Sequence, residues 1–268
     1  MWVAHFAPSL VLSRFAPATP LWALGLAGAL PDLIFFGLAA AGLESSHHSH
    51  SIPSSPEIFG LEFKGSTTNC FPFSAVYPYT HSTAGQLVLA SVFATLITVS
   101  HRLSLTSYAT LVLATLSHLP LDMAIHRLDA GTPAGADTRP IWKRHDVPLF
   151  NYPWGTYISD LGIFLFAVLF HARTVYPPDQ HAAKMGIPIV PMEQRRDFTS
   201  GYLKMLAVAA CLQAHFSFWG GGEVEQGDLA KAAIAVVETL GFAYVLSVLE
   251  GYTSVKLETR KAQSKKKQ

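Results

Sequence analysis

The sequence PLWALGLAGALPDLIFFGLAAAGL, from Pro20 to Leu43, carries one charged side chain, Asp32, in an otherwise apolar stretch. A helix needs about 20 mostly apolar residues to cross the hydrocarbon layer of a bilayer. The stretch therefore predicts a membrane-spanning helix with an ionisable group near its middle. Because such a group costs about 2.5–3.5 kcal/mol on insertion scales, Asp32 calls for a functional or structural reason.

Five further stretches of similar length and composition predict an all-α, polytopic membrane bundle of about six spans. They run from Thr83 to Val99, Ser104 to Ile125, Gly155 to His171, Gly201 to Trp219 and Leu229 to Glu250. Ahead of the first span, Trp2–Phe15 is apolar but too short to cross comfortably, and Pro17 and Pro20 end it. We expect this segment to form a short or re-entrant helix that packs against the first span.

The composition of the chain agrees with lipid as its surroundings. Of 268 residues, 50% are hydrophobic and 14% are charged, and the mean hydropathy is +0.30. Soluble proteins carry about 25% charged residues. The net charge of +1 provides no basic surface for nucleic acid, so the expected partner is the lipid bilayer and not nucleic acid. Residues 1–255 are expected to form one membrane-embedded domain, and residues 256–268 a charged, disordered tail.

Lys and Arg residues are unevenly divided between the two sides of a six-span topology. Most of them lie on the side that holds residues 1–19 and the tail, which predicts a cytosolic tail. The chain ends Lys265-Lys266-Lys267-Gln268, which resembles a dilysine retrieval signal of endoplasmic-reticulum membrane proteins. A solvated basic tail is the alternative. We therefore expect an integral membrane protein of the endoplasmic reticulum if the source is eukaryotic, or of the inner membrane if it is bacterial.

His118, Asp122 and His126 are spaced by four residues, within the third predicted span and at its end. This spacing places them on one face of a helix, about 6 Å apart per step. Imidazole and carboxylate groups in such a pattern can bind one divalent cation. The alternative is a buried His–Asp hydrogen bond, and Pro120 between the first two residues can loosen the turn.

Helical depth brings further ionisable residues to a similar level. His5 and Asp32 lie 12 residues to either side of the Pro17–Pro20 break, or about 18 Å from the turn at 1.5 Å per residue. His118 reaches about the same depth in its span, entering from the same side. His81 and Asp160 enter from the opposite surface. We therefore expect six side chains to converge in the non-cytosolic half of the bilayer: His5, Asp32, His81, His118, Asp122 and Asp160.

Several of these residues stand in short motifs whose order and spacing resemble a known family. The motifs are His5, Pro31-Asp32, Tyr77-Pro78-Tyr79-Thr80-His81-Ser82, and Ser117-His118 followed by Asp122, His126 and Arg127. They are similar to an early His, a Pro-Asp, a Tyr-Ser/Thr-His-Ser and a Ser-His-x3-Asp element of the bacterial predicted membrane-bound metal-dependent hydrolases. Asn151 before Asp160 resembles that family's Trp-Asn segment, although Phe150 stands where the family tends to have Trp.

The resemblance covers about residues 1–172 and extends distantly to the ligand pattern of zinc-dependent phospholipases C. It implies a divalent metal site, most naturally for zinc, with one or two ions. The implied ligands are His5, Asp32, His81, His118 and Asp122. The candidate catalytic residues are Asp160, as the acceptor of a proton, and His126.

The leading hypothesis is a membrane-embedded hydrolase that acts on a lipid-like ester or phosphoester. A bound metal would lower the pKa of its water to about 7. One alternative is a metal-free membrane enzyme, such as a cyclase or isomerase, that uses the buried Asp residues as acids. Another is a transporter or structural membrane protein, although the inverted repeat of many transporters is not visible in the sequence.

Overall fold

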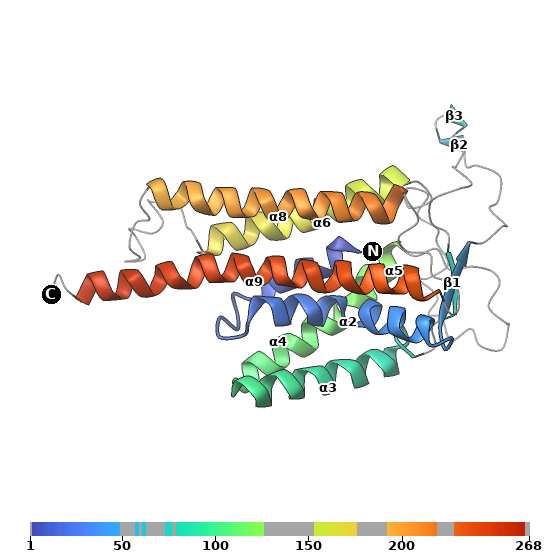
Figure 1. Ribbon diagram of the computed structural model, residues 1–268, viewed down its shortest axis with the longest axis horizontal. Coiled ribbons are helices and arrows are strands. Elements are labelled where there is room, and N and C mark those ends of the chain that lie inside the picture. Colours follow the sequence, from blue (N-terminus) through green and yellow to red (C-terminus); the bar gives the residue numbers. More distant parts are fainter. Residues whose placement is uncertain are drawn as a thin grey trace.

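The computed structural model describes the backbone of residues 2–48, 57–58, 61–62, 73–76, 79–125, 153–175, 192–218 and 228–265. These parts of the chain form a bundle of helices, of which the longest run side by side along one axis (Figure 1). Only short strands are added at one end of the bundle. The prediction of a helical fold is confirmed.

The N-terminal segment forms a short helical hairpin with the first long helix. It begins as the 3-10 helix η1 (Val3–Phe6), continues as α1 (Ala7–Leu12) and turns back into α2 (Leu21–Ala40). All four residues of η1 are buried, and the segment packs against α2 and α6. The predicted short helix against the first span is therefore confirmed, and it lies inside the bundle.

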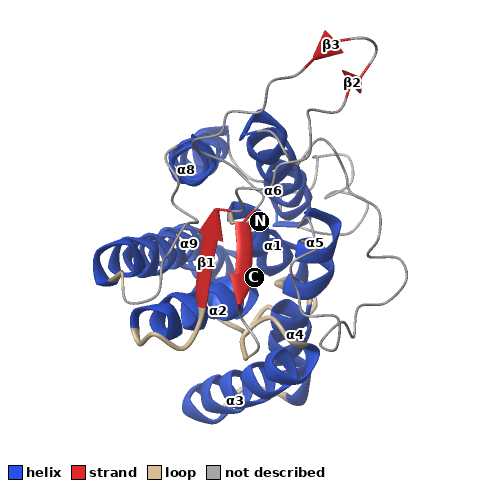
Figure 2. Cartoon of the chain, turned by 90° about the vertical axis from the view of Figure 1, so that its right-hand side faces the viewer, coloured by secondary structure: helices blue, strands red, loops and turns tan. Residues whose placement is uncertain are grey.

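The rest of the bundle surrounds α2. The helices α3 (Thr83–His101), α4 (Leu105–Leu116) and α5 (His118–Ile125) follow it in sequence, and α6 (Pro153–Val175), α8 (Met192–Phe218) and α9 (Leu229–Lys265) complete the described chain. Viewed along the bundle, α2 lies between α9 and α4, with α3 outermost and α6 and α8 on the opposite side (Figure 2). Ser82 and Ser104 cap α3 and α4 by accepting a backbone N–H.

Two short antiparallel strand pairs lie in the connection between α2 and α3. β1 (Ser45–His48) pairs with β4 (Phe73–Val76), and β2 (Glu57–Ile58) pairs with β3 (Leu61–Glu62). The register of the first pair sets Ser45 opposite Val76. The two ends of the long connection are therefore held next to each other at the end of the bundle where α2 stops and α3 starts.

Small side chains allow the helices around α2 to approach closely. The apolar cluster between α2, α3 and α4 contains Ala23, Ala27, Ala94 and Ala114, all almost fully buried. Lipid is as apolar as a side-chain core, so helices in a membrane associate through tight packing rather than through removal of water. A second cluster joins η1 and α1 to α6, α8 and α9, with the ring of Phe242 in contact with those of Phe6 and Phe164.

Four of the described helices are long and apolar enough to cross a membrane. They are Leu21–Ala40, Thr83–His101, Trp154–Thr174 and Leu229–Glu250. On α3, large apolar side chains such as Val88, Val92, Leu96 and Val99 face outward. A soluble protein rarely exposes so large an apolar surface, and this surface fits contact with lipid tails. The chain is therefore a helical membrane protein.

The other two predicted spans are not confirmed. The stretch from Ser104 to Ile125 is divided at Ser117, between α4 and α5. Pro120 has no N–H to bond the carbonyl of Leu116, which explains a break at this point. The stretch from Gly201 to Trp219 overlaps α8 up to Phe218, but α8 is not among the helices that qualify by length and composition.

The charged C-terminal segment continues α9. The helix extends to Lys265, so residues 256–265 are helical where the sequence suggests a disordered tail. The Lys, Glu, Arg, Ala and Gln residues of this segment all favour a helix, which accounts for the difference.

Two glycines of α2 offer a matched test of this packing. A Cβ at Gly28 would overlap the backbone carbonyl oxygen of His5, whereas a Cβ at Gly25 would meet the movable end of the Leu246 side chain. We expect Gly28→Ala to destabilise the protein by about 1–3 kcal/mol because a backbone cannot move aside. Gly25→Ala should be close to neutral, since Ala favours the helix by about 1 kcal/mol. Thermal unfolding in detergent measures both, and equal melting temperatures would contradict the close approach of η1 and α2.

Candidate metal centre

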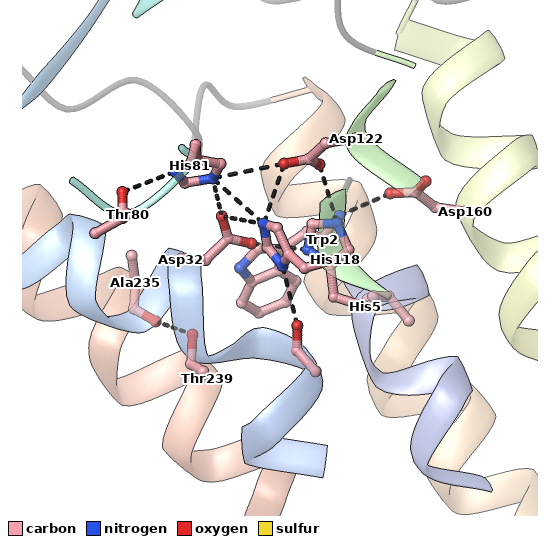
Figure 3. A network of polar contacts seen from close by, with 12 residues as sticks. Trp2, His5, Asp32, Thr80, His81, His118, Asp122, Asp160, Ala235 and Thr239 are labelled. Carbon is pink, nitrogen blue, oxygen red and sulfur yellow. Dashed lines mark hydrogen bonds and ion pairs between the residues drawn. The ribbon is translucent and has the colours of Figure 1, made fainter. Parts of the chain in front are cut away.

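Five ionisable side chains from four segments meet inside the bundle (Figure 3). They are His5 of η1, Asp32 of α2, His81 just before α3, and His118 and Asp122 of α5. Ligand atoms of two overlapping triplets lie within 4.8 Å of one another, namely those of His5, Asp32 and His118 and those of His81, His118 and Asp122. The predicted proximity of these five side chains is confirmed, and their role as metal ligands stays a prediction.

Four atoms form the inner part of this cluster. The Nε2 atoms of His81 and His118 lie 3.3 Å apart. Asp32 Oδ1 is 3.3 Å from the first and 3.5 Å from the second. Asp122 Oδ2 is 3.5 Å from His81 Nε2 and 3.1 Å from His118 Nε2. Neighbouring ligands of a tetrahedral zinc ion, bound at 2.0–2.1 Å, lie about 3.3–3.4 Å apart, and these five spacings are close to that value.

His5 contacts the remaining oxygen of each carboxylate. Its Nδ1 is 2.9 Å from Asp32 Oδ2, and its Nε2 is 3.0 Å from Asp122 Oδ1. Its ring also contacts that of His118, with ring centroids 3.7 Å apart and the ring planes tilted by 36°. A neutral ring donates to only one of the two carboxylates, and its other nitrogen presents a lone pair to the cluster.

The backbone of α2 determines which nitrogen of His118 faces the cluster. Nδ1 of His118 lies 2.9 Å from the carbonyl oxygen of Gly28, so this nitrogen carries the hydrogen and donates it. In the neutral ring, Nε2 then holds a lone pair directed at His81 and the two carboxylates. A histidine that ligates a metal commonly donates its other N–H in this way, which fixes both its tautomer and its ring orientation.

His81 has a comparable contact through a side chain. Its Nδ1 lies 2.8 Å from Oγ1 of Thr80, and that hydroxyl is 2.7 Å from Oε2 of Glu44. Since a carboxylate only accepts, the Thr80 hydroxyl donates to Glu44 and accepts from His81. In its neutral ring, His81 Nε2 therefore also presents a lone pair. When both rings are neutral, the four inward-facing atoms of the cluster are all acceptors.

Charge and burial make this arrangement costly without a cation. The side chains of Asp32 and Asp122 are only 16% and 10% exposed, and His5 and His118 are fully buried. Buried carboxylates that approach the same point raise one another's energy unless positive charge compensates them. A divalent cation between the four acceptor atoms would supply that charge, and the donor set of two imidazoles and two carboxylates suits zinc.

Asp160 of α6 lies at the edge of the cluster and belongs to neither ligand triplet of the described residues (Figure 3). Its Oδ2 accepts a hydrogen bond of 2.9 Å from the backbone N–H of Trp2. In α8, Oε1 of Gln213 accepts one of 3.1 Å from the N–H of Val3. These acceptors satisfy N–H groups at the start of η1, which have no partner within the helix. Asp160 and Gln213 therefore hold the segment that carries His5.

Some residues of the predicted motifs lie outside the part of the chain that the structure describes, and another histidine of the bundle lies apart from the cluster. His126, expected as a catalytic residue, lies outside the described residues, as do Arg127, Phe150 and Asn151. His215 of α8 forms an ion pair of 2.7 Å with Glu238 of α9.

Sequence reasoning missed two contributors to the site. Gly28 provides the carbonyl that orients His118, and Glu44 orients His81 through Thr80. Gly28 belongs to the run of small residues that precedes Asp32 by one helical turn, which is the only indication the sequence offers. Glu44 is a single carboxylate at the end of an apolar stretch, and its partner is 36 residues away.

The chain matches no family model, no curated protein and no solved structure at the level that would establish a relative. The expected relation to membrane-bound metal-dependent hydrolases therefore stays a prediction.

The geometry predicts that the purified protein binds a divalent metal through His118. We expect His118→Ala to weaken zinc affinity by more than about 100-fold, since loss of a ligand should exceed the 10–100-fold cost of losing a group that supports one. His171→Ala is a matched control, because His171 is also a buried histidine that bonds through Nδ1, 2.7 Å from the Tyr202 hydroxyl. Chelator competition on detergent-purified, folded protein measures the affinity. Equal losses in both variants would contradict a metal site at His118.

Proposed function

We propose that this protein is a membrane-embedded, metal-dependent hydrolase of a lipid-like ester or phosphoester. The observation that carries the proposal is the convergence of two imidazole nitrogens and two carboxylate oxygens, with each nitrogen 3.1–3.5 Å from both oxygens and 3.3 Å from the other nitrogen. Hydrogen bonds outside the cluster fix both imidazoles with their lone pairs inward. Such a preset donor set supports metal binding better than a simple hydrogen-bonded pair of side chains.

A zinc ion held there would act as a Lewis acid and would bring the pKa of a coordinated water near neutrality. Asp32, His81, His118 and Asp122 would hold the ion. His5, which contacts both carboxylates, would keep them in place or take a ligand position itself. Asp160 is the candidate acceptor for a proton, since it lies at the edge of the cluster and is not one of these ligands (Figure 3).

The position of the cluster supports an amphipathic substrate. The ligands come from segments within the helical bundle, whose outer helices present apolar side chains to the lipid. A water-soluble polymer would have to leave water to reach such a site, whereas a lipid already has its tails in the hydrocarbon layer. The polar part of the substrate would then meet the histidine and aspartate residues.

A second candidate function is a structural metal site. The four inner donors would fill all positions of a tetrahedral zinc ion, as they do in sites that stabilise a fold without catalysis. A metal there would join η1, α2, α5 and the start of α3. Catalysis requires in addition an open position for water or substrate, and the experiment below separates the two cases.

We also propose that the chain crosses the membrane six times, with its tail in the cytosol. In addition to the four helices that are long and apolar enough to cross a membrane, α4 and α5 together would form a fifth, interrupted crossing, and α8 would form a sixth. The excess of Lys and Arg on the side of the tail supports the orientation. If so, a reporter fused to the C-terminus will remain accessible to protease and unglycosylated in intact microsomes. A glycosylated or protected reporter would overturn this topology.

The hydrolase proposal predicts that Asp160→Asn abolishes turnover while metal content and melting temperature stay near those of the wild type. Asn keeps an oxygen for the Trp2 N–H and occupies nearly the same volume, but it cannot take up a proton. A screen of lipid esters and phosphoesters in vesicles measures turnover, with chelator-treated and zinc-reloaded wild type as references.

If the metal only stabilises the fold, we expect a different effect of substitutions on stability and activity. His118→Ala would then lower the melting temperature strongly, and no stable variant would lose activity selectively. If the metal-loaded wild type turns over no lipid ester or phosphoester, the hydrolase proposal fails and the structural role remains.

A further inference from the structure

Glu44 is a buried carboxylate beyond the end of α2, and it lies outside the cluster of metal-ligand candidates. It is only 2% exposed, and burial of a carboxylate is costly unless hydrogen bonds compensate it. Its described partners lie in two consecutive residues across the long connection. Oε1 accepts the backbone N–H groups of Tyr79 at 2.9 Å and Thr80 at 3.0 Å, and Oε2 accepts the Thr80 hydroxyl at 2.7 Å.

These contacts fix the direction of a short chain of hydrogen bonds. The single hydroxyl hydrogen of Thr80 goes to Glu44, so Thr80 Oγ1 can only accept from His81 Nδ1 at 2.8 Å. The hydrogen of a neutral His81 ring then sits on Nδ1, and the lone pair sits on Nε2. That Nε2 is the atom that lies 3.3 Å from both His118 Nε2 and Asp32 Oδ1.

We propose that Glu44 is a positioning residue of the metal centre, which acts through Thr80 to hold His81 in the tautomer and orientation that ligate. The inference rests on the proposed metal centre. His81 needs this support because it precedes α3 in a turn, where no helix holds it. His118, by comparison, lies within the helical segment and is held by the Gly28 carbonyl. Outer contacts of this kind determine which nitrogen of a histidine is available to a metal.

The same contacts make Glu44→Gln a selective probe. The two backbone N–H groups hold the amide oxygen of Gln at the position of Oε1, so its NH2 group must face Thr80. Thr80 then accepts from Gln and donates to His81 Nδ1, which reverses the chain. The His81 hydrogen moves to Nε2, the atom needed for the metal, although the contacts between Glu44 and the backbone are kept.

The experiment combines metal affinity with the tautomer of His81. Affinity for Co2+ and Zn2+ is measured by chelator competition on detergent-purified, full-length protein. The tautomer is read from 15N spectra of histidine-labelled, metal-free protein, with His81→Ala to assign the signal. Thr80→Val removes the hydroxyl, Thr80→Ser restores it, and Glu250→Gln is the control. Glu250 accepts the Leu21 N–H at 2.8 Å, at the end of α2 away from the site.

We expect Glu44→Gln and Thr80→Val to weaken metal affinity by about 10–100-fold, the usual effect of losing a group that orients a ligand. Thr80→Ser and Glu250→Gln should stay within about twofold of the wild type. The wild type should show His81 with its hydrogen on Nδ1, and Glu44→Gln should show it on Nε2.

Three results would overturn the role of Glu44. They are wild-type affinity in folded Glu44→Gln and Thr80→Val, an unchanged tautomer in Glu44→Gln, and an Nε2–H tautomer in the wild type. Failure of the metal centre itself is distinguishable. In that case the wild type binds neither metal, and the spectra of the metal-free protein still decide whether Glu44 sets the His81 tautomer.

Discussion

Two buried carboxylates, Asp32 and Asp122, place the strongest constraint on this structure. Each lies among apolar helices, and each has both of its oxygens against histidine nitrogens, one toward His5 and one toward His81 and His118. These contacts between carboxylate oxygens and histidine nitrogens join four segments that are far apart in the sequence. The N-terminal segment must lie inside the bundle to deliver His5, and the connection after α2 must return to the bundle to deliver His81.

Hydrogen bonds outside the cluster determine which nitrogen of each histidine can present a lone pair to it. An imidazole can present either a hydrogen or a lone pair, and its outer contact decides which. The carbonyl of Gly28 accepts from Nδ1 of His118, and Thr80, which donates to Glu44, accepts from Nδ1 of His81, so the hydrogen of each neutral ring is on Nδ1. If both rings are neutral, these contacts leave lone pairs inward beside two carboxylate oxygens, and this arrangement supports the proposed cation site. The buried His–Asp contact that the sequence also allowed is present as well, with His118 Nε2 3.1 Å from Asp122 Oδ2, so metal binding stays a prediction.

Those features of the site that depend on periodicity and depth could be predicted from the sequence. A spacing of four residues joins His118 to Asp122, and equal distances from the Pro17–Pro20 break bring His5 level with Asp32. The break between α4 and α5 was harder to predict, because Pro120 is compatible with either a kink or a new helix. The bonds from Trp2 to Asp160 and from Thr80 to Glu44 leave no periodic pattern at all. They join single side chains to distant segments, and only the folded arrangement reveals them.

The proposed function depends most on a metal ion held by histidine and aspartate inside the membrane. X-ray absorption at the zinc edge of the zinc-loaded, detergent-purified protein tests this most directly. We expect nitrogen and oxygen ligands at about 2.0–2.1 Å from the zinc ion, together with the outer scattering of two or more imidazole rings. A first shell of water oxygens without imidazole scattering, a shell that contains sulfur, or a protein that retains no zinc would contradict it.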